Sequence, residues 1–271
     1  MTLDLAALSA SAQALARSAG EAIMAVYRRD FSVEYKNDHS PLTQADLAAH
    51  LVLATGLAAL SPALPVLSEE SADTVTTAER RSWTRYWLVD PLDGTREFVK
   101  RNDEFTVNIA LVDQGEAVLG VVYAPALGEM AHAVRRGGAW FDTGVGPVAL
   151  HARRAPARPV IAVSRSHANA ATIALLDGIG AHETMAAGSA LKFIRLAQGE
   201  ADLYPRLGPT SEWDTAAGQC VLEEAGGGLV DLRGTPFRYN QRDTVLNPSF
   251  LAYGDTGTGW PHRLAPYLPS T

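Results

Sequence analysis

Five apolar segments follow one another in the first half of the chain, with turn signals between them. Residues 113–115 and 137–138 carry glycines of the kind that tight turns favour. Strands joined by such short connections lie antiparallel. The sequence therefore predicts a mainly antiparallel sheet at the centre of this half. Its expected strands are residues 86–90, 105–112, 117–124, 129–134 and 139–142.

Helical periodicity precedes this sheet and alternates with strands after it. Apolar residues recur at helical spacing from about residue 5 to 26 and from about 43 to 60. A Pro- and Arg-rich linker covers residues 151–159, and strand and helix patterns alternate beyond it. This order predicts an α/β fold, a layered α+β sandwich with an α+β domain (1–152) and an α/β domain (153–271). The later elements are expected at strands 160–164, 183–188 and 201–204, and at helices 168–178, 189–198 and 215–225.

Composition and charge exclude several classes of protein. The chain has 271 residues, 47% of them hydrophobic, and a formal net charge of −7. Such a charge disfavours general binding to nucleic-acid polymers or anionic membranes, and leaves open a local basic pocket for a phosphorylated ligand. The single cysteine, Cys220, excludes an internal disulfide and a cysteine-based zinc cluster. With no basic export signal and no apolar run of about 18 residues, we expect a cytoplasmic protein without a transmembrane segment.

The stretch WLVDPLDGTREF is an apolar strand that meets two acids. We expect the strand to end at Asp90, because the proline that follows lacks an N–H group. Gly94 permits a left-handed turn, and Thr95 can begin a helix. Asp90, Asp93 and the Leu92 carbonyl would then meet free helix N–H groups, a layout that suits Mg²⁺ and phosphate. The alternative interpretation is a turn that carries solvated acids.

Two other metal or nucleophile motifs do not fit this stretch. A calcium loop that began at Asp90 would need an oxygen side chain at Leu92 and a glutamate at Arg101. Phosphatases with an aspartyl nucleophile place their two aspartates one residue apart, whereas two residues intervene here. A metal-bound water is therefore the better candidate nucleophile.

Further acids follow a second strand and open a later helix. Glu69 and Glu70 follow the short strand PVLS, and Asp214 lies at the start of a helix of small residues in EWDTAAG. A solvated loop would explain the glutamates, and helix capping would explain Asp214. Taken together with the two acids of DPLDG, these residues could instead hold two or more Mg²⁺ ions.

These motifs carry a family resemblance. DPLDGTREF, EWDTAAG and SEE together resemble the lithium-sensitive, magnesium-dependent phosphatase superfamily of inositol monophosphatases and 3′(2′),5′-bisphosphate nucleotidases. The resemblance spans nearly the whole chain, because SPLTQAD, GVVYAP, SRSH, GSALKF, DLYPRLGPTSEWDTAAG and LNPSF occur in the order of the nucleotidase branch. Arg96 stands where many relatives carry lysine, which keeps the charge and changes the contact geometry.

The resemblance assigns roles to residues in both predicted domains. It implies that Asp46, Glu69 and Thr95 hold and orient the attacking water. It implies two or three Mg²⁺ ions, bound mostly by the first domain, through Glu69, Asp90, the Leu92 carbonyl, Asp93 and Asp214. The substrate pocket and the last metal ligand would belong to the second domain. The implied substrate-binding residues are Lys36, Gly94, Thr95, His167, Gly188, Ser189, Lys192, Arg206 and Asp214.

The segment GSALK could supply a second phosphate site. We expect Ser189 to open a helix and Lys192 to lie one turn in, so that a hydroxyl, backbone N–H groups and an ammonium meet a 5′-phosphate. Arg206 would add a second cation. From spacing alone, a plain helix cap and solvated cations explain the same residues, and only the resemblance favours phosphate binding. His167 would lie beside an adenine.

The resemblance implies a Mg²⁺-dependent enzyme that removes the 3′-phosphate of adenosine 3′,5′-bisphosphate. It would yield AMP and phosphate, be inhibited by lithium, and support sulfur assimilation by clearing a by-product of sulfate activation. An inositol or sugar monophosphatase on the same fold is the alternative, and a non-catalytic nucleotide-binding protein is a remote one. The resemblance also implies a possible homodimer.

Overall fold

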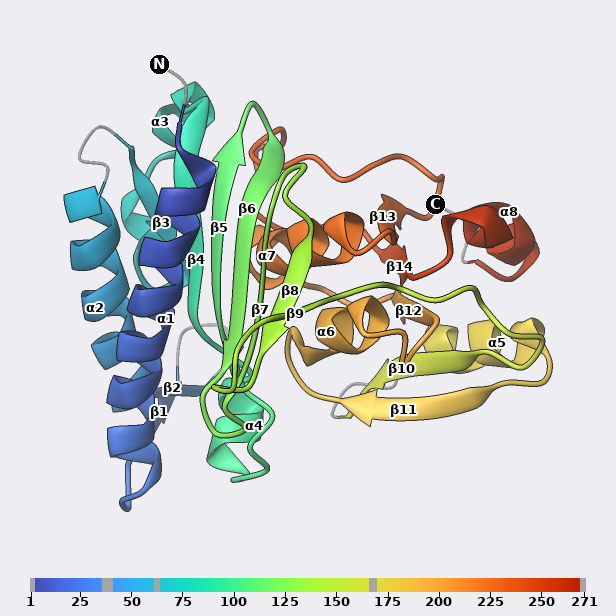
Figure 1. Cartoon of the computed structure of the whole chain (residues 1–271), viewed down its shortest axis with the longest axis horizontal. Coiled ribbons are helices and arrows are strands. Elements are labelled where there is room, and N and C mark those ends of the chain that lie inside the picture. Colours follow the sequence, from blue (N-terminus) through green and yellow to red (C-terminus); the bar gives the residue numbers. More distant parts are fainter. Residues whose placement is uncertain (1–2, 36–40, 61–63, 166–169, 269–271) are drawn as a thin grey trace.

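The computed structural model describes residues 3–35, 41–60, 64–165 and 170–268. They form five stacked layers in which helices and sheets alternate, as Figure 1 shows. The outer helical layer consists of α1 (Leu5–Tyr27) and α2 (Gln44–Leu60). This architecture confirms the predicted layered α/β sandwich.

The first sheet has seven strands in the described chain, in the order β3-β4-β5-β6-β7-β8-β9. Only β3 and β4 run parallel, and the other neighbouring pairs are antiparallel. The prediction of a mainly antiparallel sheet is confirmed. The strands are β3 (Val66–Ser68), β4 (Arg85–Asp93), β5 (Thr106–Asp113), β6 (Glu116–Ala124), β7 (Glu129–Val134), β8 (Ala139–Asp142) and β9 (Val148–Ala149).

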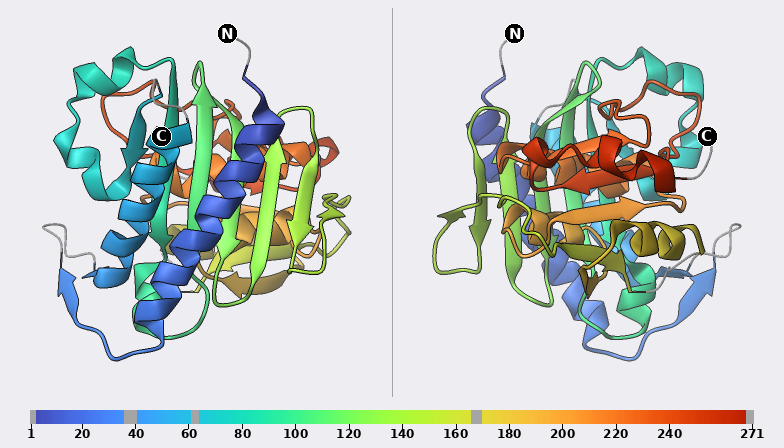
Figure 2. Two further views of the ribbon diagram at one scale, coloured as in Figure 1. Left: turned by 60° about the vertical axis from the view of Figure 1, so that its left-hand side comes forward. Right: turned by 90° about the vertical axis from the view of Figure 1, so that its right-hand side faces the viewer.

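Both faces of this sheet are buried, because alternate side chains enter two different cores. Trp87 and Val89 pack with α1 and α2, which cross one face in Figure 2. Tyr86 and Leu88 point to the other face, which α6 (Leu191–Ala197) and α7 (Glu212–Glu224) cover. The central strands consequently read as continuous apolar runs.

The second sheet has five strands in the described residues, in the order β11-β10-β12-β14-β13. The helices α5 (Ala170–Ile179) and α8 (Trp260–Leu264) lie on its outer side, where Trp260 and Leu264 pack on the strands. The sequence predicted the first three strands and missed the last two. The strands are β10 (Val160–Ser164), β11 (Glu183–Ala187), β12 (Leu203–Arg206), β13 (Gly228–Asp231) and β14 (Phe250–Tyr253).

Short elements connect these layers. A pair of short antiparallel strands, β1 and β2, lies beside α2, and short helices flank β3, β4 and α8. None of the helices that the structure describes is long and apolar enough to cross a membrane. The short elements are β1 (Val33–Tyr35), β2 (Pro41–Thr43), η1 (Glu69–Thr74), α3 (Thr77–Ser82), α4 (Thr95–Val99), η2 (Thr256–Thr258) and η3 (Ala265–Tyr267).

Two predicted helix boundaries were wrong. The helix expected at residue 189 begins at Leu191, because Ser189 adopts a left-handed φ of 46° that no helix can contain. The helix expected at Thr215 begins at Glu212, one turn earlier. Both differences change how the predicted substrate-binding residues are held.

One core joins the two sheets. It includes residues of β4 to β8, of α6 and α7, and of the second sheet. The two sheets lie on opposite sides of the expected boundary at 152/153, but the helices between them pack on both. The division into two domains at this boundary therefore stays a prediction.

Close packing between β6 and α7 allows a test of this shared core. A Cβ atom at Gly120 would lie 2.3 Å from the Ala217 backbone oxygen. We expect Gly120→Ala to lower the free energy of unfolding by about 2 kcal/mol, because the backbone of α7 must move. Urea denaturation measures the change. Gly257→Ala, where the added atom meets only a side-chain oxygen at 3.2 Å, is the control, and equal losses in both variants would contradict this packing.

Candidate active site

The strand that carries the paired acids does not end at Asp90, as the sequence predicted. β4 continues to Asp93 through an irregularity, with Asp90 opposite Asn108 and Asp93 opposite Thr106. The extra residue forms a β-bulge, which accommodates Pro91 because a bulged position need not donate to the ladder. The Leu92 N–H donates instead to Asp90 Oδ1 at 3.0 Å.

The bulge brings both acids toward a third one from α7. Asp90, Asp93 and Asp214 each offer a carboxylate oxygen, and these atoms lie within 4.8 Å of one another. Asp214 lies in the first turn of α7, where it accepts the Ser211 N–H at 2.8 Å. Helix capping and clustering therefore occur together, and we call these three residues the acid cluster.

Burial and the charges of nearby acids raise the pKa of every acid in the cluster. Burial contributes most, raising the pKa of Asp93 to about 6 and that of Asp214 to about 8. The pKa of the fully buried Asp90 is raised well above its usual range, by burial and then by Glu69 and the other acids. Glu69, in the first turn of η1, is outside the acid cluster itself, but its charge acts on all three members.

The donors of this site fit magnesium. Several carboxylates buried together are costly unless a cation compensates their charge. The donors are oxygen atoms, the ligands that a hard divalent cation prefers. Asp90, Asp93 and Asp214 could therefore hold Mg²⁺. Glu69, whose charge acts on all three, and the carbonyl of Leu92, which lies between Asp90 and Asp93, could be further oxygen donors.

These pKa shifts predict how pH changes the stability of the metal-free protein. Folded pKa values of about 6 for Asp93 and about 8 for Asp214 exceed the value near 4 of an unfolded carboxyl group. The folded state therefore binds more protons, so this stability is complete below about pH 4 and is lost as the pH rises through 6 and 8. Urea denaturation in a chelator should show this decline, and saturating Mg²⁺ should remove it. A metal-free protein that gains stability from about pH 5 to 8 would contradict the raised pKa values.

Asp46 and Thr95 form a second polar contact beside the acid cluster. Asp46 is 2% exposed, and its Oδ2 accepts both the N–H and the hydroxyl of Thr43 at 2.7 Å. Its Oδ1 accepts the Thr95 hydroxyl at 3.2 Å, and the Leu92 carbonyl lies 3.3 Å from the same hydroxyl. The structure thus brings together the two residues that the resemblance linked to a water. Their roles stay predictions.

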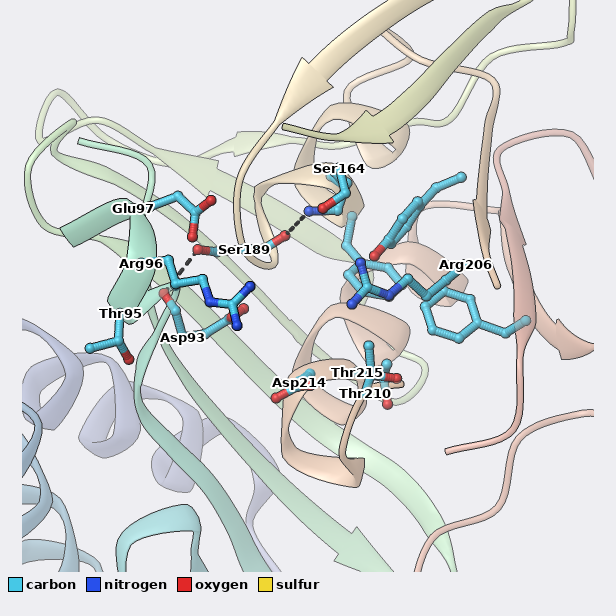
Figure 3. A pocket seen from close by; sticks show the side chains of 15 residues that line it. Asp93, Thr95, Arg96, Glu97, Ser164, Ser189, Arg206, Thr210, Asp214 and Thr215 are labelled. Atoms are coloured by element: carbon cyan, nitrogen blue, oxygen red, sulfur yellow. Dashed lines mark hydrogen bonds between the residues drawn. The ribbon is translucent and has the colours of Figure 1, made fainter. Parts of the chain in front are cut away.

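A pocket of about 190 Å³ opens next to the acid cluster. In Figure 3, the side chains of Arg96 and Arg206 extend toward the same space from opposite sides, with Asp93 and Asp214 near its floor. Gly94, Thr95, Ser189 and Lys192, for which the resemblance implied a role in substrate binding, also line it, and that role stays a prediction. The pocket therefore has acids at one end and cations on its walls.

The two predicted cations of the second half are held differently. Lys192 is 3% exposed and its Nζ donates to the Ala187 and Ser189 carbonyls at 3.1 and 2.6 Å. Burial lowers its pKa to about 8, while the charge of Asp93 opposes that shift. Arg206 Nη2 donates to the Pro209 carbonyl at 2.9 Å, and its Nε is buried without a hydrogen-bond partner among the described residues.

Ser189 and Gly188 form the turn that precedes α6. The Ser189 hydroxyl lies 2.8 Å from the Asp93 carbonyl and 2.7 Å from the Glu104 carbonyl, so it ties this turn to the first half of the chain. Gly188 packs against Glu97 and Glu104. Lys36 and His167, two other predicted substrate residues, lie outside the described residues.

Sequence reasoning missed several residues of the site. Ser164, Glu97, Thr210 and Thr215 line the pocket, and nothing in their spacing marked them. Asn108 did carry a signal, because a buried amide in an apolar strand needs a partner. Its Nδ2 donates to Asp93 Oδ2 at 3.2 Å.

An acidic, oxygen-only centre beside a cationic pocket is the arrangement of a metal-dependent phosphate site. The model of the inositol monophosphatase family matches residues 4–258, so the chain belongs to the inositol monophosphatase family. The 3′(2′),5′-bisphosphate nucleotidase CysQ of Escherichia coli (strain K12) is 50% identical over 238 residues, 87% of this chain and 95% of that protein.

Two further relatives agree with this assignment. The 3′(2′),5′-bisphosphate nucleotidase CysQ of Buchnera aphidicola is 40% identical over 243 residues, 88% of this chain and 90% of that protein. The crystal structure of CysQ from Bacteroides thetaiotaomicron, a bacterial member of the inositol monophosphatase family, matches with a TM-score of 0.82 and 36% identity. That match covers 93% of this chain and 99% of the other. Fold and sequence therefore point to the same family.

Proposed function

We propose that this protein is a Mg²⁺-dependent phosphatase that removes the 3′-phosphate of adenosine 3′,5′-bisphosphate, yielding AMP and phosphate. Relatives named 3′(2′),5′-bisphosphate nucleotidase, at 50% identity over 87% of the chain, support it. In a cell this reaction would clear a by-product of sulfate activation. A cytoplasmic location and a homodimer remain predictions.

The observation that carries the proposal is a pocket with two different ends. The acid cluster would engage the phosphate that is removed, through bound cations. Lys192 and Arg206 would hold the phosphate that stays. The Nε of Arg206 supports this assignment, because a buried donor without a partner is costly and a phosphate oxygen would satisfy it.

The protein's oxygen donors would hold Mg²⁺ at one end of this pocket. We propose Glu69, Asp90, the Leu92 carbonyl, Asp93 and Asp214 as the donors of two or three ions. Bound Mg²⁺ would supply positive charge that activates water and stabilises the leaving oxygen.

Asp46 and Thr95 would orient the water. Asp46 Oδ1 accepts the Thr95 hydroxyl proton, so that the hydroxyl oxygen remains free to accept a hydrogen bond from water. When the water directs one of its hydrogens toward the Thr95 oxygen, a lone pair of the water points at phosphorus, as in-line displacement requires. The bond from phosphorus to the 3′-oxygen breaks as the water oxygen bonds to phosphorus. The attacking water gives up one proton as it bonds to phosphorus, and the released 3′-oxygen takes up one proton, so that the net reaction consumes one water and yields AMP and phosphate.

A comparison of substrates tests the proposed function. Purified protein with Mg²⁺ should show a kcat/KM for adenosine 3′,5′-bisphosphate that exceeds the value for inositol 1-phosphate by about 100-fold or more, because inositol 1-phosphate lacks the second anion. The reverse order would favour an inositol or sugar monophosphatase. Nucleotide binding without Mg²⁺-dependent turnover would indicate a non-catalytic binding protein.

A further inference from the structure

Glu104, a residue of the first half of the chain, fixes the turn between β11 and α6. It lies in the segment that joins α4 to β5. Its carboxylate accepts the Gly188 N–H at 2.9 Å, and its backbone carbonyl accepts the Ser189 hydroxyl at 2.7 Å. Two consecutive residues of the turn are therefore bound to one residue of the other half.

Arg165 completes this connection from the end of β10. Its Nε and Nη2 donate to the two carboxylate oxygens of Glu104 at 2.8 and 2.7 Å, in the paired geometry that makes such bonds strong. Its Nη2 also donates to the Ala186 carbonyl at 3.0 Å. Glu104 thus holds β10 and the end of β11 as well as the turn.

The two halves touch so closely here that their relative position is fixed. A Cβ atom at Gly188 would lie 2.6 Å from the Glu104 backbone oxygen, and one at Gly94 would lie 2.3 Å from Ser189 Oγ. Ser189 keeps its left-handed φ of 46° between these contacts. Such a conformation costs free energy and persists only where the surroundings determine it.

The same turn aims the Lys192 ammonium. Lys192 Nζ donates to the carbonyls of Ala187 and Ser189, which flank the residue that Glu104 binds. The acid cluster lies on β4 and α7, and its described side-chain hydrogen bonds involve other residues. Glu104 therefore acts on the position of the cation relative to the acids.

We propose that Glu104, with Arg165, is a positioning residue that sets the separation between the acid cluster and the Lys192 ammonium, and thereby the preference for substrates with two phosphates. This inference rests on the proposed function. A substrate with a single 3′-phosphate engages the acid cluster and gains little from Lys192. A bisphosphate must contact the acid cluster and the Lys192 ammonium at the same time, so a change in their separation lowers its kcat/KM more than that of the monophosphate.

The experiment compares two substrates in two variants. Glu104→Gln removes the charge that Arg165 binds. Glu129→Gln is the matched control, because Glu129 also joins the two halves, through Arg195 at 2.7 Å, and is similarly buried, at 21% exposed against 20% for Glu104. We measure kcat/KM for adenosine 3′,5′-bisphosphate and for adenosine 3′-monophosphate. The ratio of kcat/KM for the bisphosphate to kcat/KM for the monophosphate should fall about tenfold in Glu104→Gln, the effect of losing one charge-assisted hydrogen bond. The same ratio should stay at the wild-type value in Glu129→Gln.

A folded Glu104→Gln variant with the wild-type ratio would overturn the inference. If Glu104→Gln does not fold, Arg165→Gln removes the same ion pair and the same ratio decides. Calorimetric binding of AMP to metal-free protein gives a readout independent of turnover, and it should weaken about tenfold in Glu104→Gln. A wild type that leaves the bisphosphate intact would contradict the proposed function, whereas a wild type that cleaves it, with unchanged ratios in the variants, would contradict only the role of Glu104.

Discussion

Asp90→Asn should lower phosphatase activity by about 10³-fold or more at saturating Mg²⁺, because it removes a charge from the centre of the acid cluster. The same substitution should raise the thermal midpoint of the metal-free protein at pH 8 by a few degrees, about 1 kcal/mol. The reason is that Asp90 is 1% exposed and is repelled by Glu69, Asp93 and Asp214. Opposite effects on activity and stability would mark a site built to hold cations.

Activity assays and thermal unfolding, each with and without Mg²⁺, check both results. Asp113→Asn is the control, since Asp113 lies at the far end of β5 and pairs with Arg85 at 3.0 Å. The Asp113→Asn variant should turn over substrate at nearly the wild-type rate. Full activity in Asp90→Asn, or a metal-free variant less stable than wild type, would refute the proposed role of the acid cluster.

Lys192→Met should lower kcat/KM for adenosine 3′,5′-bisphosphate by about 100-fold and that for adenosine 3′-monophosphate by much less. Methionine keeps the length of the side chain and removes the charge, so the expected loss is about 3 kcal/mol from a buried charge-assisted contact with phosphate. The ammonium also lies 5.1 Å from the centre of the Tyr204 ring, which helps to hold it in place.

The control for Lys192→Met is the same change at the other lysine that the structure describes. Lys100 directly follows α4 and is exposed, and Lys100→Met should leave the ratio of the two kcat/KM values as it is in the wild type. Equal losses for both substrates in Lys192→Met would show that Lys192 serves the structure and not the second phosphate.

Much of the fold and the acid cluster could be predicted from the sequence. The apolar runs of β5 to β8 and the short turns between them favour an antiparallel sheet, because both signals are local in the sequence. Asp90 and Asp93 after an apolar strand, and Asp214 at the start of a helix of small residues, indicate a metal site only in combination, and the family resemblance supplies their roles. Signals of this kind depend only on residues that are close in the sequence, so they can be recognised without the structure.

Features that depend on distant contacts could not be predicted. The bulge at Pro91 and the left-handed Ser189 are conformations that other parts of the chain impose. β14 lies between β12 and β13 in the second sheet, an order that no local pattern encodes. Glu104 appears in the sequence as an ordinary loop acid, since its partners Arg165 and Gly188 lie 61 and 84 residues further along the chain.

The identity of the product tests the central claim most directly. Adenosine 3′,5′-bisphosphate is incubated with the purified protein and Mg²⁺, and phosphorus NMR distinguishes the two possible monophosphates. If the 3′-phosphate is cleaved at the acid cluster, and Lys192 and Arg206 only bind the 5′-phosphate, the product is AMP with its 5′-phosphate intact. A chelator then abolishes the formation of AMP. Release of the 5′-phosphate to leave adenosine 3′-monophosphate, or turnover that persists in the chelator, would contradict this account.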